Sequence, residues 1–498
     1  ALRQMRAQPK TSHVAAPPPV GGWNARDALT AMPPEDAVTL DNFYPDASKV
    51  VTRKGYTGHA TGVGSGAVET LFEYHGASGR KLLAASSDTL YDATNAGAAS
   101  SLATGFSNGR WQGANFNDLA LLVNGADTPQ VFDGSALANS TIAGSGLTSS
   151  NLIGVNVHKS RVYVWEGSSQ DFWYGATNAI GGTFTKFPLS RVSQTGGTLT
   201  AMGTWTVDGG AGVDDLAVFL MSSGEAIVYQ GSDPGDASAW SIVGRFQIGT
   251  PLGIRALAKV GADLVVATRD DYVSLSQALT KARVAVPENK IRPAIIQAAA
   301  STGGNFGWDM TVFPSGGFLL VNVPTTSGAF EQHVQNLVTK AWCRFKDVPA
   351  NCWALYNDRL YFGGGGGEVF RFWDGADDDG SAISADGLGA WTGMGGRGRK
   401  RVSAVRPVLG ATGSLTYQFG LGIDFKTPTV SEPSTITATG TPWGSPWGSP
   451  WSPENTITAA WRATAGTGDV FAPRLRVSAT KEVSWFRTDY RTEGSIGL

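Results

Sequence analysis

The sequence predicts an all-β protein built around a β-propeller of about six to eight blades. The first observation is a recurring pattern of two apolar runs separated by Gly, Asn, Asp or Ser, which is typical of a β-hairpin. It returns about every 40 to 55 residues, at 82–92, 119–134, 161–173, 216–229, 264–275, 318–334 and 360–372. The second observation is the composition. Only 16% of the residues are charged and 65 are glycine, which is typical of a turn-rich β protein. Since one blade cannot bury its own faces, the repeats indicate a single closed ring of sheets.

The order of patterns along the chain suggests three regions. Residues 1–66 form an N-terminal arm followed by short strands between Pro, Asp and Asn turns. Residues 67–379 hold the repeats and are expected to form the propeller, with a short helical insertion near 277–299. Residues 380–498 return to strand-like patterns and include a Pro-Trp-Gly-Ser loop. At 498 residues the chain exceeds the usual size of one hydrophobic core, so at least two units are expected.

Charge, cysteine content and motifs argue against several functional classes. The net charge of -2 provides no global field for holding nucleic acid or anionic lipid. Cys343 and Cys352 match neither a zinc ribbon nor a disulfide framework, and we expect two buried thiols. No long apolar run is present, so we expect neither a membrane span nor a signal peptide. The histidines are scattered and no nucleophile elbow, P-loop or zincin motif is found, so we expect no enzyme activity and no cofactor.

Three stretches share a combined pattern. They are Gly-Trp-Asn-Ala-Arg-Asp at 22–27 with Leu-Asp-Asn-Phe-Tyr-Pro at 40–45; Val-Tyr-Gln-Gly-Ser-Asp-Pro at 228–234 with Pro-Leu-Gly at 251–253; and Ala-Trp-Cys-Arg-Phe at 341–345 with Cys-Trp at 352–353 and Leu-Tyr-Phe-Gly at 360–363. Together they resemble the tail nozzle or tail-hub (tail tubular) proteins of short-tailed bacteriophages, the podoviruses. The resemblance covers most of residues 22–420.

The resemblance implies a virion structural protein, made in the host bacterial cytoplasm and placed in the tail. It implies a cyclic homo-oligomer, a hexamer, below the portal and the adaptor or head-to-tail connector protein. Double-stranded DNA would pass through it transiently, and tail fibre, spike or needle proteins would attach to it. It also implies that residues 1–66 and 380–498 pair into one β-rich platform domain around the inserted propeller. Trp23, Arg26 and Phe43 of the first stretch are then candidate subunit contacts.

Two charged segments are further candidates. Arg399 and Arg401 belong to the only concentrated basic run, and we expect a subunit or partner contact. A phosphate contact is the alternative, since each Lys or Arg contact adds salt-sensitive affinity for DNA; the sequence leaves the DNA-contacting residues unknown. Asp377 and Asp379 lie in an oxygen-rich turn that would suit calcium, but it lacks the ligand spacing of an EF-hand, which favours a solvated turn.

Three tryptophans stand apart from the rest. Trp443, Trp447 and Trp451 lie in a segment in which Pro-Trp recurs every four residues, and proline at that spacing excludes a helix or central strand. A loop with three large rings needs another surface to cover them. We expect docking on an adjacent subunit or tail component, with packing onto the same chain as the alternative.

The abundance of tryptophan also keeps a second function open. The chain has 16 tryptophans, and exposed aromatic rings can stack on carbohydrate. The alternative is therefore a carbohydrate-binding or polysaccharide-degrading β-propeller involved in receptor recognition. Acidic residues that converge on the propeller axis would favour it, and a scaffold propeller outside any virus is a third possibility.

Overall fold

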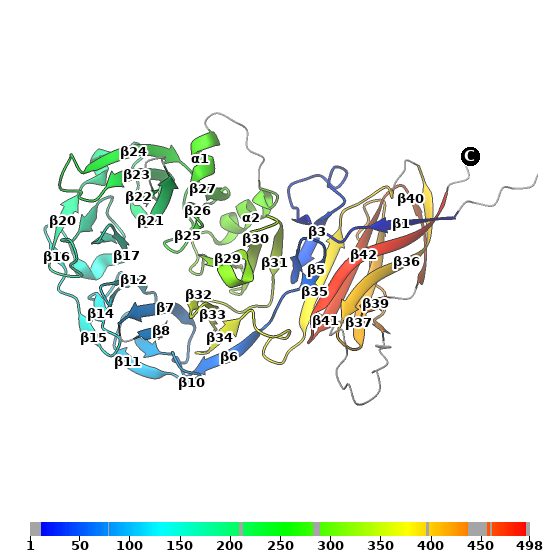
Figure 1. Ribbon diagram of the computed structural model, residues 1–498, viewed down its shortest axis with the longest axis horizontal. Helices are drawn as coiled ribbons and strands as arrows, with labels where there is room; N and C mark the ends of the chain where they lie inside the picture. The colour runs from blue at the N-terminus through cyan, green and yellow to red at the C-terminus, as the bar shows by residue number, and fades with distance from the viewer. Residues whose placement is uncertain are drawn as a thin grey trace, which may run out of the picture. The chain divides into compact units, whose positions relative to one another are not determined.

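The computed structural model describes residues 11–77, 79–208, 213–281, 289–394, 398–436, 456–458 and 461–494. It is nearly all β, with 54% strand and 6% helix. The chain divides into two compact units (Figure 1). The first, which we call the platform, comprises Ala1–Thr57, Val334–Lys346 and Trp373–Leu498, and the second, which we call the propeller, comprises Gly58–His333 and Asp347–Phe372. The domain boundaries predicted from the sequence are 66/67 and 379/380, and they assign Val334–Lys346 to the propeller.

The propeller begins with four sheets that follow one another along the chain. Their strands are β7 (Val68–Gly76), β8 (Gly79–Ser86), β9 (Thr89–Asp92) and β11 (Ser100–Thr104); β12 (Gln112–Phe116), β13 (Leu119–Val123), β14 (Gln130–Phe132) and β15 (Leu137–Asn139); β17 (Leu152–His158), β18 (Arg161–Glu166), β19 (Phe172–Tyr174) and β20 (Thr183–Phe187) with β16 (Ala143–Gly144); and β21 (Leu199–Asp208), β22 (Val213–Met221), β23 (Glu225–Gly231) and β24 (Trp240–Gln247). Middle strands such as β13 are buried over nearly their whole length, because neighbouring sheets cover both faces.

Three more groups of strands complete the ring. They are β25 (Leu257–Val260), β26 (Asp263–Ala267) and β27 (Tyr272–Ser274); β28 (Asp309–Phe313), β29 (Phe318–Pro324) and β30 (Phe330–Asn336); and β32 (Cys352–Tyr356), β33 (Arg359–Gly363) and β34 (Val369–Phe372) with β6 (Tyr56–Thr61) and β10 (Gly97–Ala98). The inner strands β32, β7, β12, β17, β21, β25 and β28 contact one another in this order and return to β32. The described chain thus confirms an all-β propeller within the expected range of six to eight blades.

The last of these sheets joins strands from the two ends of the propeller sequence. Strand β6 lies next to β34, so a strand that precedes β7 shares a sheet with β32, β33 and β34, all of which follow residue 350. Two helices lie between β27 and β28: α1 (Leu275–Lys281), and α2 (Arg292–Thr302) with Pro293 in its first turn, where proline costs no hydrogen bond. Residues 282–288 of the expected insertion lie outside the described residues. Neither helix has the length and hydropathy needed to cross a membrane.

The platform contains two sheets built from both ends of the chain. One contains β1 (Thr11–Ala16), β4 (Phe43–Pro45), β5 (Val50–Thr52), β36 (Lys400–Ala411), β39 (Thr456–Thr458), β40 (Arg462–Gly468) and β42 (Val483–Gly494). The other contains β2 (Gly22–Trp23), β3 (Asp36–Asp41), β31 (Trp342–Phe345), β35 (Ile383–Gly389), β37 (Leu415–Ile423), β38 (Ser434–Ile436) and β41 (Phe471–Ala479). Strand β1 pairs with β42, and β3 pairs with β35, so each sheet contains both N-terminal and C-terminal strands.

A close contact between the two platform sheets depends on a glycine. Phe43 and Trp485 from the first sheet are fully buried, with ring centroids 6.2 Å apart. A Cβ atom on Gly387 of the second sheet would lie 3.0 Å from the Trp485 ring and 3.3 Å from the Phe43 ring. Glycine at this position therefore lets the sheet backbone approach two large aromatic rings.

Arg53 connects all three chain segments of the platform. Its side chain has no exposed surface, and its guanidinium donates to both carboxylate oxygens of Asp378 at 2.7 Å. It also donates to Oδ1 of Asn42 at 2.9 Å and to the carbonyl oxygens of Lys54 at 3.1 Å and Lys346 at 3.3 Å. A planar guanidinium with five N–H donors satisfies all of these acceptors at once. Arg53 therefore holds the three segments together.

Candidate functional site

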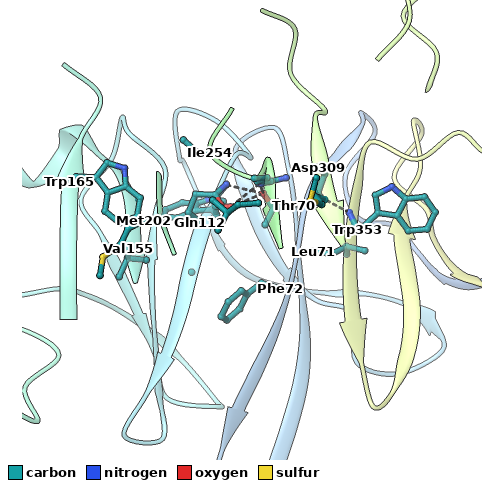
Figure 2. Close-up of a pocket in the computed structure, with 16 residues that line it drawn as sticks. Thr70, Leu71, Phe72, Gln112, Val155, Trp165, Met202, Ile254, Asp309 and Trp353 are labelled. Carbon is teal, nitrogen blue, oxygen red and sulfur yellow. Dashed lines mark hydrogen bonds between the residues drawn. The ribbon is translucent and has the colours of Figure 1, made fainter. Parts of the chain in front are cut away.

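The inner strands of the propeller line an open cavity of about 300 Å³ on the ring axis. Each of the seven inner strands contributes at least one lining residue, among them Thr70 from β7, Gln112 from β12, Val155 from β17, Met202 from β21, Leu257 from β25, Asp309 from β28 and Trp353 from β32. Figure 2 shows most of these side chains around the cavity. Because the lining residues come from every blade, the space that they surround lies at the centre of the ring.

Two glycines allow bulky side chains to pack beside the cavity. A Cβ atom on Gly154 would lie 2.0 Å from the Trp165 ring, and one on Gly113 would lie 2.7 Å from the Phe72 ring. Any side chain at these positions would force the rings to move, because real Cβ atoms do not approach other atoms so closely. The Trp165 and Phe72 rings therefore pack close to the strand backbone beside the cavity.

Asp309 is the carboxylate of this cavity. It is 8% exposed, and its Oδ2 accepts a hydrogen bond from the backbone N–H of Trp353 at 3.2 Å. Burial raises the pKa of Asp309 to about 6, although the positive charge of Arg255 and hydrogen bonds from the Trp353 and Met310 backbone act in the opposite direction. A carboxyl group with such a pKa changes its protonation state close to physiological pH.

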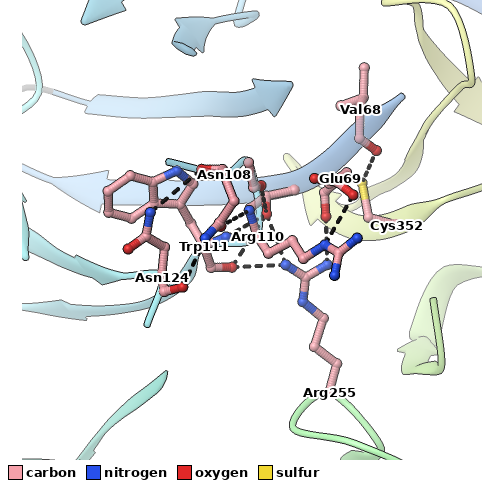
Figure 3. A network of polar contacts seen from close by, with 10 residues as sticks. Val68, Glu69, Asn108, Arg110, Trp111, Asn124, Arg255 and Cys352 are labelled. Atoms are coloured by element: carbon pink, nitrogen blue, oxygen red, sulfur yellow. Dashed lines mark hydrogen bonds and ion pairs between the residues drawn. The ribbon is translucent and has the colours of Figure 1, made fainter. Parts of the chain in front are cut away.

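Arg255 crosses the ring axis and forms a polar network with strands on the far side. It precedes β25, whose neighbours in the ring are β21 and β28. Its guanidinium nevertheless donates to the carbonyl oxygen of Glu69 at 2.8 Å, to Oγ1 of Thr70 at 2.8 Å and to the carbonyl oxygen of Trp111 at 2.9 Å, as Figure 3 shows. These acceptors lie on or beside β7 and β12. Arg255 therefore ties one side of the ring to the other.

The same residues separate the axial cavity from a second one. Gln112, Ile254 and Arg255 line both the axial cavity and a neighbouring cavity of about 240 Å³, so they form the wall between them. Phe306 lies against this wall, with the guanidinium carbons of Arg110 and Arg255 at 4.4 and 5.3 Å from its ring centroid. Cation–π contacts on Phe306 thus add to the hydrogen bonds that hold Arg255 in place.

Gln112, which lines the axial cavity, has an unpartnered donor in its side chain. Its Nε2 atom is buried and has no hydrogen-bond partner among the described residues. Most buried polar side-chain atoms in native proteins are hydrogen-bonded, so an unpartnered amide at a cavity requires an explanation.

The structure places the N-terminal candidate contacts within the platform. Trp23 is 6% exposed and lies 5.0 Å below the guanidinium of Arg344, and Phe43 is fully buried. Within this chain the two rings are core residues, so Trp23 leaves little and Phe43 leaves no surface for a partner. Arg26 is 29% exposed and pairs with its neighbour Asp27 at 2.7 Å.

The C-terminal candidates are placed differently. Arg399 is exposed, and Arg401 is 61% exposed and lies 3.7 Å from Glu493. Trp443, Trp447 and Trp451 lie outside the described residues.

Asp377 and Asp379 do not form a metal site with other described residues. Asp377 accepts the backbone N–H of Gly380 at 2.7 Å, which is a local turn contact. Asp379 is exposed and has a left-handed backbone with φ of 48°. Asp378, between them, is the buried partner of Arg53. The described part of the chain contains no group of three His, Cys, Asp or Glu residues arranged to hold a metal ion.

A row of charged side chains on one platform sheet was not expected from the sequence. Asp41 lies opposite Arg344 on one side and Asp386 on the other, and Asp386 lies opposite Arg476. Lys346 also pairs with Asp41 at 2.9 Å, and Arg474 pairs with Asp386 at 2.7 Å. We call these six residues the charged row; four cations against two carboxylates give it a net charge of +2.

The Asp386 carboxylate of the charged row is held in the ionised form by its two arginines. Burial raises the pKa of Asp386, but hydrogen bonds from Arg474 and Arg476 outweigh it and hold the pKa below its usual value. Arg476 and Lys346 keep 42% and 41% of their side chains exposed. The alternation of Arg474 and Arg476 along one strand was the only signal in the sequence, since the row depends on pairing between distant segments.

Comparisons with known proteins bear on the fold. No family model and no curated protein matches the chain. Among solved structures, it is similar to YCF48 bound to D1 peptide, with 9% identity and a TM-score of 0.36 over 68% of this chain and 98% of that one. It is also similar to Raptor of Chaetomium thermophilum, with 13% identity and a TM-score of 0.39 over 64% and 29%, and to BBS1N in complex with ARL6DN, with 8% identity and a TM-score of 0.37 over 64% and 96%. Such low similarity carries no function to this chain.

Proposed function

We propose that this protein is a structural component of a bacteriophage short tail, a nozzle or hub that forms a ring-shaped conduit for genome ejection below the portal and adaptor. The proposal starts from the three sequence stretches that resemble tail nozzle proteins. The observation that carries it furthest is the composite platform, in which both chain ends share two sheets and leave the propeller as an inserted module. A separate body of this kind is suited to contacts between copies around a ring.

In this proposal the conduit lies between subunits and outside the axis of each propeller. The propeller axis is crossed by Arg255, which holds the wall between two small cavities. A DNA duplex has a major groove of about 12 Å in width alone, far wider than an axis occupied by one side chain. A cyclic assembly instead creates a central passage by repeating one heterologous contact around its symmetry axis.

The cationic surfaces of the platform are the proposed contacts with acidic partners. The charged row has a net charge of +2, and Arg399 and Arg401 add exposed guanidiniums. Such groups suit acidic turns on a neighbouring copy or on the adaptor, and complementary charge speeds and orients association. Because all four cations of the row are already paired with its two carboxylates, its affinity for passing DNA would be small, as a conduit requires.

Electron microscopy of purified phage particles labelled with an antibody to this chain tests the proposal. We expect label at the tail vertex, and light scattering of the purified protein with its adaptor should give a ring of defined mass. Arg399→Glu combined with Arg401→Glu should reduce ring formation, whereas Arg359→Glu, at an exposed arginine on the propeller, should not. Label absent from the virion, or a protein that remains a monomer with its adaptor and degrades polysaccharide, would refute the proposal and support the carbohydrate-active alternative.

A further inference from the structure

We propose that the open cavity beside the axial cavity binds a small carboxylic acid with an apolar body, whose carboxylate is held by Arg110. This second cavity has a volume of about 240 Å³, and Arg110 is one of its lining residues. The site lies within the propeller and does not depend on the proposed role in a tail.

Arg110 offers an accessible guanidinium whose orientation is fixed. Its side chain is 53% exposed, and its Nε donates to Oε1 of Glu69 at 3.0 Å (Figure 3). The guanidinium carbon lies 4.4 Å from the ring centroid of Phe306. Both terminal nitrogens remain without a hydrogen-bond partner among the described residues. Two parallel N–H groups of an arginine are the donors that a carboxylate accepts in a bidentate pair.

The charges around this cavity favour an anion with a single charge. Arg110 and Arg255 line it, whereas no acidic side chain is among its described lining residues. Arg255 donates to carbonyl and hydroxyl oxygens, which leave its positive charge in place. Glu69 pairs with Arg110 from outside the lining, so these three groups have a net charge of +1. Asp309 lines the axial cavity, on the other side of the wall that Arg255 forms.

The walls of the second cavity suit an apolar body. Its lining includes the side chains of Ile153, Leu252, Ile254, Phe306 and Trp308. Ile153, Ile254 and Phe306 are only partly buried, so they keep apolar surface that a ligand can cover. Removing such surface from water favours binding. The volume of about 240 Å³ lies just below the usual range for drug-sized ligands, so a smaller acid fits.

Isothermal titration calorimetry of the full chain with phenylacetate and 4-methylpentanoate tests this inference. At least one of these acids should bind. Phenylacetamide, which lacks the charge, and acetate, which lacks the apolar body, should each bind about tenfold more weakly or worse.

Variants at Arg110 test the role of its guanidinium. Arg110→Gln should weaken binding of the acid about tenfold or more, because a charge-assisted pair is lost. Arg110→Lys keeps the charge without the planar fork, so its affinity should lie between those of Arg110→Gln and the parent, and it provides a second variant if Arg110→Gln does not fold. Arg80→Gln is the matched control and should bind as the parent does, since Arg80 is also exposed and paired with a glutamate, Glu73 at 3.4 Å, but does not line the cavity.

Three results would overturn the inference. They are no heat of binding with either acid, equal affinity for phenylacetate and phenylacetamide, and equal affinity in the parent and Arg110→Gln. Two further titrations check the class of ligand. Tighter binding of inorganic phosphate than of both acids would contradict a site for an apolar monocarboxylate, and tighter binding of a short peptide that ends in leucine would contradict the assignment to a small acid.

Discussion

Replacing Arg53 by methionine should destabilise the platform strongly. The substitution keeps an unbranched apolar side chain but removes the guanidinium that donates to Asp378, Asn42 and two backbone carbonyl groups. The Asp378 carboxylate would remain buried, at 9% side-chain exposure, without its cation. An unpaired buried charge is far more costly than the loss of a surface ion pair.

The expected magnitude follows from that burial. Breaking a buried ion pair by removing one partner costs about 3–5 kcal/mol. For a unit of roughly 200 residues, each kcal/mol lowers the melting temperature by about 2–4 °C, so the platform transition should fall by about 6–20 °C. Adding Asp378→Asn to Arg53→Met should recover part of the loss, because the orphaned charge is removed.

Differential scanning calorimetry combined with hydrogen exchange of β36 and β42 measures this effect on the platform itself. Arg359→Met on β33 is the matched control, since Arg359 is exposed, and its melting temperature should stay close to that of the parent. A loss of less than about 1 kcal/mol for Arg53→Met, the value of an exposed pair, would refute the reasoning that Arg53 holds the three segments together.

Three further predictions concern the propeller and the thiols. Arg255→Met removes three hydrogen bonds across the ring axis and should cost about 3 kcal/mol, measured by denaturant unfolding together with faster hydrogen exchange in β7 and β12; unchanged exchange there would contradict it. The pKa of Asp309 is raised to about 6, so the stability that this one group contributes should be lost as pH rises from about 4 to 6. Asp309→Asn should therefore gain up to about 3 kcal/mol relative to the parent at about pH 7.5 compared with about pH 4, and melting curves that differ equally at both pH values would exclude this. Burial raises the pKa of Cys343 and of Cys352, the latter to about 12, so neither thiol should react with Ellman's reagent until the protein is unfolded.

Local patterns were sufficient to predict the blades. The apolar runs at 82–92 and 119–134 form the hairpins β8–β9 and β13–β14, because turn residues and apolar periodicity act within about ten residues. The candidate site could not be predicted from such local patterns. Gln112, Arg255 and Asp309 come from three distant segments, and only closure of the ring brings them to one cavity. Nothing in the sequence near Asp309 distinguishes it from the other acidic residues.

Two features of the platform also could not be predicted from the sequence. Trp23 and Phe43 were interpreted as contact residues, yet an aromatic residue beside turn signals looks the same in a sequence whether it is covered by its own chain or by a partner. The charged row depends on the register of Asp41 against Asp386, a pairing across more than 300 residues of chain. This register is determined by the pairing of distant strands and cannot be recognised from the sequence around either residue.

The pairing of β6 with β34 and of β1 with β42 has a consequence for biosynthesis. A ribosome releases β6 long before β34 exists, and β1 long before β42 exists, so neither unit can be completed until these later strands have been made. Until then both early strands expose unpaired edges, which makes unfinished chains prone to aggregation and dependent on chaperones. Only finished copies acquire both folded units, so premature termination products are excluded from any assembly that requires them.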